Sequence, residues 1–163
     1  MFESLTYSGT VSEQYKQLNR QLDALLSGEY DRIAHLSNAS SLLNQFLKEV
    51  NWVGFYLMKQ DELILGPFQG LPACVRIPKG KGVCGTAVSE GMTQRIDNVH
   101  EFPGHIACDA ASNSEIVIPI YLDGDLYGVL DIDSPSFSRF SEEDQQGLEA
   151  FTEILTKHLR QSS

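Results

Sequence analysis

Apolar and polar positions alternate most regularly between residues 115 and 133. The apolar positions of the first run are Ile116, Ile118 and Ile120, and those of the second are Leu126, Leu130 and Ile132 around Gly128. A period of two predicts two β-strands, each with one face toward a core. The opposite face then holds three acids, Glu115, Asp131 and Asp133, where a plain core strand would carry none.

The turn at 122–125 decides how these two strands pair. A two-residue Asp-Gly loop would set Asp131 opposite Ile116 and push a carboxylate among apolar side chains. A three-residue loop with Gly124 in the left-handed conformation sets Glu115 opposite Asp131, and we therefore predict this register. Directly paired Cβ atoms lie about 5 Å apart, and alternate residues of one strand about 6.7 Å apart. All three carboxylates are thus expected within reach of one small ligand.

A cluster of three acids needs compensation, because like charges this close oppose one another's ionisation. No Lys or Arg lies between Cys108 and Pro135. We therefore expect a cationic ligand group, a metal ion, or a carboxyl group that stays protonated. The alternative is a solvated outer sheet face, on which acids need no partner.

The remaining patterns complete an α+β fold class. Helical stripes cover 12–27, 31–49 and 141–161, and a Gly-rich turn opens a fourth helix within 79–91. We predict Ser12 as the N-cap of the first helix and a capping box between Ser141 and Asp144 in the last. Strand patterns at 51–59, 63–68, 75–78 and 93–96 join the two acid-bearing strands. The order predicts one antiparallel sheet of about six strands flanked by helices.

The whole chain limits the classes of function. Its 163 residues suit a single domain, and its net charge of −10 argues against a nucleic acid or an anionic membrane as partner. A signal-peptide pattern and a run of about 18 apolar residues are both absent, which favours a cytoplasmic protein. Three cysteines make an odd count, which argues against a fully paired secreted framework.

Two aromatic residues and one thiol mark a candidate pocket. Trp52 and Tyr56 share a face of the strand 51–59 and can wall a site around a methyl or thioether group, although ordinary core packing would use the same spacing. Cys84 follows the Gly-rich turn, and we expect the positive end of its helix to lower the thiol pKa. Free N–H groups near 82–85 would suit a carboxylate.

The cysteines allow a redox reaction or a metal site. A thiolate at Cys108, in the polar loop 98–114, could form a sulfenic acid that a second thiol captures. A zinc site built from all the cysteines with His100 or His105 is the competitor, but no ligand pair has the usual close spacing. Cys74 alone would be read as a small buried hydrophobe.

Four segments carry a resemblance to a known family. NWVGFY, KGVCGTAV, HIACDAASNSEIVIP and YGVLDIDSP resemble, in order and spacing, the free methionine-(R)-sulfoxide reductases, which are built on the GAF fold. The resemblance covers nearly all of the chain beyond about residue 30. It implies a single GAF domain over 1–163, with about 1–30 as an N-terminal helical extension and about 31–163 as the core.

The resemblance also implies a reaction. Cys108 matches the nucleophile that attacks the sulfoxide sulfur, Cys74 the resolving thiol that forms a disulfide with it, and Cys84 an auxiliary cysteine. The residues that it implies for substrate binding are Glu115, Asp131, Asp133, Trp52 and Tyr56. Thioredoxin would be the external reductant, with no cofactor and no metal, and the protein would be a homodimer. The R-epimer and the preference for free methionine sulfoxide come from the resemblance alone.

Two other classes of protein remain as alternatives. A GAF sensor would bind a small ligand without catalysis, although the Asn-Lys…Phe…Asp-Glu pattern of cyclic-nucleotide-binding GAF domains is absent. A structural or interaction protein would leave the thiols and acids unexplained. Thiol-dependent reduction of a sulfoxide separates the enzyme from both.

Overall fold

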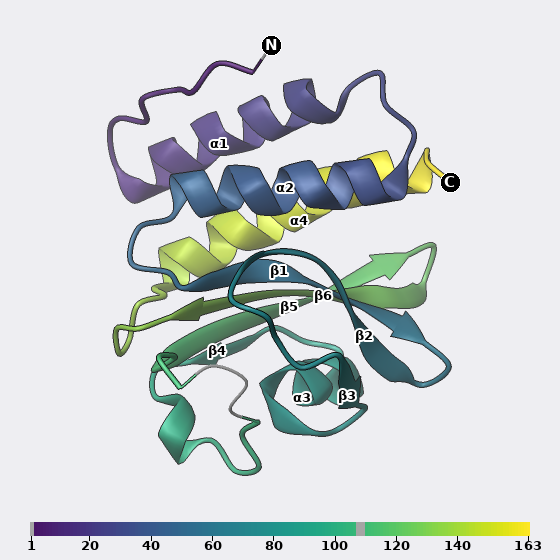
Figure 1. Cartoon of the computed structure of the whole chain (residues 1–163). Helices are drawn as coiled ribbons and strands as arrows, with labels where there is room; N and C mark the ends of the chain where they lie inside the picture. Colours follow the sequence, from purple (N-terminus) through teal and green to yellow (C-terminus); the bar gives the residue numbers. More distant parts are fainter. Residues whose placement is uncertain (1, 107–109) are drawn as a thin grey trace.

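One antiparallel sheet forms the centre of the molecule (Figure 1). The structure is a computed structural model that describes residues 2–106 and 110–163. Within them the strands are β1 (Trp52–Lys59), β2 (Glu62–Gly70), β3 (Arg76–Pro78), β4 (Gln94–Ile96), β5 (Ser114–Leu122) and β6 (Asp125–Ser134). The six strands of the described chain lie in the order β3-β2-β1-β6-β5-β4, which confirms the predicted α+β class.

Helices cover both faces of the sheet. Those of the described residues are α1 (Val11–Leu26), α2 (Arg32–Phe46), α3 (Gly82–Glu90) and α4 (Glu142–Arg160), with a 3₁₀ turn at Val99–Glu101. Figure 1 shows α1, α2 and α4 together on one face and α3 on the other. No helix in the part of the chain that the structure describes is long and apolar enough to cross a bilayer.

The alternation of β1 separates two cores. Val53 and Phe55 pack in the larger core under α1, α2 and α4, whereas Trp52 and Tyr56 pack in the smaller core with residues of α3. Ile116, Ile118, Leu130 and Ile132 join the larger core, as their spacing predicts. The face opposite them is also covered, because residues of α3 pack against it, and Glu115 and Asp131 on this face are buried.

The register of β5 and β6 differs from the prediction. Glu115 pairs with Asp133 and Val117 with Asp131, so the partners of residues 114–120 are displaced by two residues and those of 121 and 122 by one. The loop has two residues, Asp123 and Gly124, both with positive φ, and Leu122 pairs with Asp125 across it. Such a loop is typical of a tight hairpin, since its twist matches that of the strands.

A β-bulge explains why the acids still share one face. The pairing shifts between Ile120 and Tyr121, where Ile120 opposes Gly128 and Tyr121 opposes Leu126. The extra residue restores the parity that a two-residue loop would otherwise break. It also turns Leu126 toward the smaller core, so the prediction that Leu126 shares a face with Leu130 is wrong.

Helix ends follow capping chemistry more closely than the sequence stripes indicate. Thr10, not Ser12, is the N-cap of α1, because its backbone is extended and its hydroxyl accepts the Glu13 N–H at 3.1 Å. The capping box of Ser141 and Asp144 is confirmed in α4. Gly91 ends α3 in the left-handed conformation, which glycine adopts without strain.

The helix α1 is held to α4 by a close aromatic contact. The Tyr15 hydroxyl donates a buried hydrogen bond of 2.6 Å to Asp144, and its ring lies flat against Gly147. A Cβ atom at Gly147 would come within 2.2 Å of that ring. Only the lack of a side chain at this position lets the two helices approach so closely.

Gly147→Ala is therefore expected to destabilise the protein by about 1–3 kcal/mol, the usual cost of overpacking a core. The neighbouring exposed Gln146 provides the matched control, and Gln146→Ala should change stability by less than about 0.5 kcal/mol. Urea unfolding of both variants measures the difference. Equal urea midpoints for the two variants would show that α1 and α4 can move apart at little cost in free energy.

Candidate active site

The acids lie at the centre of the sheet. On β6, Asp131 pairs with Gly54 of β1 on one side and with Val117 of β5 on the other. Asp133 pairs with Trp52 and with Glu115 in the same way. The three acids therefore point to the same face as Trp52 and Tyr56 of β1, and all five residues line one pocket.

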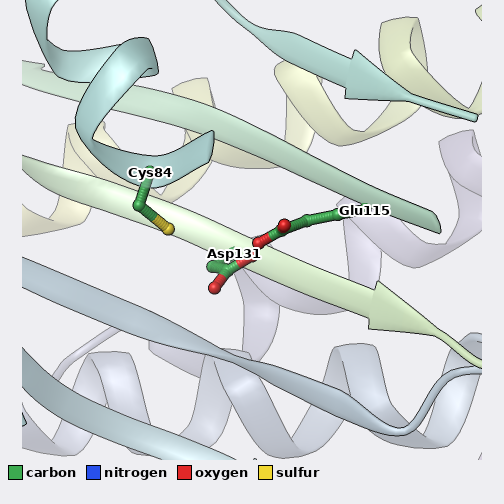
Figure 2. A group of neighbouring side chains, drawn as sticks. All are labelled: Cys84, Glu115 and Asp131. Atoms are coloured by element: carbon green, nitrogen blue, oxygen red, sulfur yellow. The ribbon is translucent and has the colours of Figure 1, made fainter. Parts of the chain in front are cut away.

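The acid cluster is buried. Glu115 and Asp131 are each 6% exposed, and Cys84 of α3 is 4% exposed. Figure 2 shows the Cys84 sulfur directed from the helix toward Asp131, and the Glu115 carboxyl group reaching Asp131 from the neighbouring strand. One ligand-type atom of each lies within 4.8 Å of the other two. Burial on this scale rules out the solvated sheet face that the spacing alone allowed.

Burial and mutual repulsion keep a proton on this cluster. Burial, with the charges of Asp131 and Asp133, raises the pKa of Glu115 well above its usual range. Burial also raises the pKa of Asp131, while hydrogen bonds from Glu115 and Cys84 oppose that rise. A neutral Glu115 beside an ionised Asp131 is the arrangement that these effects favour. The expectation of a protonated carboxyl group thus agrees with the geometry.

One carboxylate oxygen of the cluster can accept a further hydrogen bond. Oδ1 of Asp131 is buried and has no hydrogen-bond partner among the described residues. A buried acceptor without a donor is costly, and native proteins rarely retain one without a reason. The atom points to a donor or cation that enters the pocket from outside.

The prediction of a lowered thiol pKa at Cys84 is wrong. Burial raises the pKa of Cys84 well above its usual value, and the neighbouring carboxylates add to the effect. These influences outweigh the partial positive charge of the α3 N-terminus. The predicted carboxylate-binding N–H groups are also fewer than expected, because the Gly85 N–H donates to the Lys81 carbonyl at 3.0 Å.

The aromatic pair forms one wall of the pocket. The rings of Trp52 and Tyr56 stack with centroids 5.7 Å apart and planes inclined by 24°. The Trp52 indole N–H donates to the Leu71 carbonyl at 3.1 Å, and the Tyr56 hydroxyl donates to the Cys74 carbonyl at 2.9 Å. The two side chains therefore also hold the loop that carries Cys74.

Several lining residues were missed by the sequence reasoning. They are Leu71, Pro72, Ala73, Ile77, Lys81, Val83, Ile106 and Ser112, together with His105, which had been considered only as a zinc ligand. Lys81 lines the acidic pocket from a distant segment, which only the tertiary fold reveals. No local pattern at the lining aliphatic residues distinguishes them from ordinary core or loop positions.

The predicted cysteines have different outcomes in the structure. Cys84 lies with the acids, and Cys74 lies on the loop bound by Tyr56. Cys108 lies outside the described residues, although His105 and Ile106, which precede it in the chain, line the pocket. Among the described residues, the possible metal ligands that cluster are Cys84, Glu115 and Asp131, not the cysteine and histidine set considered from the sequence.

Comparison with known proteins gives this site a family. Residues 22–159 match the GAF domain family. The free methionine-R-sulfoxide reductase of Escherichia coli is 56% identical over 148 residues, which are 91% of this chain and 90% of that protein. The chain belongs to the free methionine-R-sulfoxide reductase family of GAF domains.

Solved structures extend the match of this GAF protein to three dimensions. The reduced form of fRMsr of Staphylococcus aureus has 56% identity and a TM-score of 0.88, covering 96% of this chain and 99% of that one. Free methionine-R-sulfoxide reductase from Neisseria meningitidis, in complex with its substrate, has 40% identity and a TM-score of 0.93 over 99% of this chain and 98% of that one. The match thus spans the whole GAF protein.

Proposed function

We propose that this protein reduces free L-methionine-(R)-sulfoxide to L-methionine. One observation carries the proposal: a buried pocket combines a partly protonated acid pair with a stacked aromatic wall, in a chain 56% identical to a reductase of that name. A free amino acid supplies the cation that the acids lack. Its α-ammonium group donates to Asp131 and Asp133, while Trp52 and Tyr56 surround the methyl end of the sulfoxide.

The pocket explains why the substrate is a free amino acid. A residue inside a polypeptide has no α-ammonium group, so it would leave the buried Asp131 oxygen unpartnered and would have to thread a chain beneath α3. A buried site discriminates strongly against a ligand that leaves one of its polar groups unpaired. It discriminates far less against a ligand that only lacks a methyl group. Selectivity for free methionine sulfoxide follows from this difference.

Cys108 and Glu115 divide the chemistry of the first step. The Cys108 thiolate attacks the sulfoxide sulfur, one proton adds to the sulfoxide oxygen, and the resulting hydroxyl group passes to the Cys108 sulfur as both of these atoms separate from the substrate sulfur. The products are methionine and a sulfenic acid on Cys108, so the protein is oxidised by the two electrons that the sulfoxide gains. Glu115 is the proton donor, because burial and the neighbouring acids raise its pKa and favour its protonated form.

Recycling uses the second thiol. The Cys74 thiol attacks the sulfenic acid sulfur, a disulfide forms and water leaves. Thioredoxin then reduces the disulfide by thiol exchange and becomes oxidised itself. Cys84 is auxiliary in this scheme, since its buried thiol has a raised pKa and is a poor nucleophile before the pocket opens. The cytoplasmic location and the homodimer stay predictions.

Separate assays of the two sulfoxide epimers test the proposal. Fully reduced protein receives free L-methionine-(R)-sulfoxide or the S-epimer with dithiothreitol, and methionine release is measured. We expect turnover of the R-epimer and little or none of the S-epimer. Release from neither, in folded protein, would make the non-catalytic GAF ligand-binding module the better account.

Asp131→Asn is expected to raise KM for methionine sulfoxide on the order of 10–100-fold, because a hydrogen bond to a charged group contributes about 1.5–3 kcal/mol. Asparagine keeps the shape but loses the charge that attracts the ammonium group. Steady-state kinetics with the R-epimer measures the change. A KM within twofold of the wild type would remove Asp131 from substrate binding.

Tyr56→Phe is expected to slow repeated turnover by about 2–10-fold while leaving the first turnover nearly unchanged. The phenyl ring keeps the stack on Trp52, but the hydrogen bond that holds the Cys74 loop is lost. One neutral hydrogen bond contributes about 0.5–1.5 kcal/mol. Thioredoxin-coupled and single-turnover assays separate the two steps, with exposed Tyr30→Phe as control. A matching loss in both assays would mean that the Tyr56 hydroxyl acts on the substrate and not through the Cys74 loop.

A further inference from the structure

The Cys84, Glu115 and Asp131 side chains have the composition of a metal site. One sulfur and two carboxylate oxygens, one from each residue, lie within 4.8 Å of one another (Figure 2). They come from α3, β5 and β6, elements held together by the smaller core. The donors are therefore brought together by the fold rather than by a flexible loop.

A second observation indicates that this group lacks a ligand. Asp131 is 6% exposed, and its buried Oδ1 has no hydrogen-bond partner among the described residues. Acids and a thiol alone would be an ordinary polar cluster if every atom were paired. A buried, unpaired carboxylate oxygen next to a thiol is a coordination position that a cation would fill.

From this geometry we propose that Cys84, Glu115 and Asp131 bind one zinc ion, which competes with the ammonium group of the substrate. The ion is a reversible inhibitor rather than a resident cofactor, because it occupies the place that the substrate needs. The competition rests on the proposed function, whereas the metal site itself does not.

The donor set selects the class of metal. Zinc accepts thiolate sulfur at about 2.3 Å and carboxylate oxygen at about 2.0–2.2 Å, often with a fourth position left for water. Magnesium and calcium prefer oxygen ligands alone and gain little from a thiolate. The three ligand atoms lie within 4.8 Å of one another, and a tetrahedral site requires the side chains to rotate until these atoms are closer.

Binding of the ion releases protons from the site. On binding, the thiol of Cys84 and the carboxyl group of Glu115 release their protons to solvent, which leaves one negative charge on each of the three ligands. The two positive charges of zinc offset most of this negative charge. No oxidant or reductant is required.

Cobalt(II) titration of the fully reduced protein tests the site directly. A thiolate bound to cobalt gives a charge-transfer absorption in the near ultraviolet, and zinc should displace the cobalt and abolish the band. We expect one ion per chain in the wild type and in Cys108→Ser. The band should be lost in Cys84→Ser, and binding should weaken at least tenfold in Glu115→Gln. Exposed Glu142→Gln is the matched control and should bind as the wild type does.

Two outcomes would overturn the metal site. One is cobalt binding without the charge-transfer band, and the other is a band that survives in Cys84→Ser but disappears in Cys108→Ser. X-ray absorption at the zinc edge, on the Cys108→Ser complex, provides a measurement that does not need a folded Cys84 variant. It should show one sulfur among oxygen neighbours, and oxygen and nitrogen neighbours alone would contradict the site.

The failure of the site and the failure of the proposed function are distinguishable. If the band forms and zinc raises the apparent KM for the R-epimer, both stand. A band in protein that reduces neither epimer would support the metal site and contradict the proposed reaction. Normal turnover in protein that shows no band would support the proposed reaction and contradict the metal site.

Discussion

Cys108→Ser is expected to abolish methionine release, whereas Cys74→Ser should still release about one methionine per site and then stall without a small thiol. The serine hydroxyl cannot replace a thiolate as the nucleophile toward the sulfoxide sulfur. The Cys74 variant keeps the nucleophile but cannot close the disulfide, so the sulfenic acid persists. Rapid-quench measurement of methionine in the first turnover separates the two variants.

The same experiment has internal controls. Dithiothreitol should restore repeated turnover to Cys74→Ser, because a small thiol can reduce a sulfenic acid directly. Dimedone reacts with sulfenic acids, so one dimedone adduct per chain should form in Cys74→Ser after substrate is added. None should form in Cys108→Ser. Equal first-turnover yields in both variants would refute the assignment of nucleophile and resolving thiol.

Glu115→Gln is expected to lower kcat by about 10²–10⁴-fold and, at the same time, to raise the stability of the protein at neutral pH. Glutamine cannot deliver a proton to the sulfoxide oxygen, and general acid catalysis typically contributes a factor of this size. It also removes a buried group that keeps a proton in the folded state, whereas the same group loses that proton in the unfolded state. Activity and stability should therefore move in opposite directions.

The pH dependence of unfolding gives the sign of the stability effect. The pKa of Glu115 is raised in the folded protein from an ordinary value near 4.5, so above that pH the folded state holds a proton that the unfolded state has lost. Stability then falls as pH rises from about 4.5 through the folded pKa. Glu115→Gln should remove this slope, so its melting temperature should match the wild type near pH 4 and exceed it at pH 8.

Glu142→Gln is the control for the charge change alone. Glu142 is exposed in the first turn of α4, away from the pocket-lining residues. The kcat of this variant should stay within twofold of the wild type. Its melting temperature should change with pH as that of the wild type does. A similar loss of kcat in both variants would mean that net charge, not a proton at Glu115, limits the reaction.

Periodicity was sufficient to assign the faces of β5, and those of β6 beyond the bulge, but not to fix the pairing. The spacing of Ile116, Ile118 and Ile120 depends only on the strand geometry of their own segment, and the larger core contains all of them. The register depends on whether a bulge forms near Tyr121, which is a balance between two turns of similar free energy. The face of the acids was therefore predictable, while the partner of Glu115 was not.

The error at Cys84 has a different origin. A thiol near a helix N-terminus is expected to be acidic, and that expectation uses only the chain around it. Its true environment is set by Glu115 and Asp131, which lie on strands far away in sequence. The cation of Lys81 was missed for the same reason. The burial of a side chain and the electrostatic field around it are properties of the assembled fold, so the local sequence cannot predict them.

The β-bulge at the tip of the β5–β6 hairpin also limits how this protein can evolve. A single residue gained or lost between the bulge and Asp131 would reverse the alternation and turn the acid into the opposite core. Two residues gained or lost together, or one that appears with a compensating bulge, would leave the acid facing the pocket. Related sequences should therefore differ in length between the bulge and Asp131 by an even number of residues, unless a compensating bulge is present.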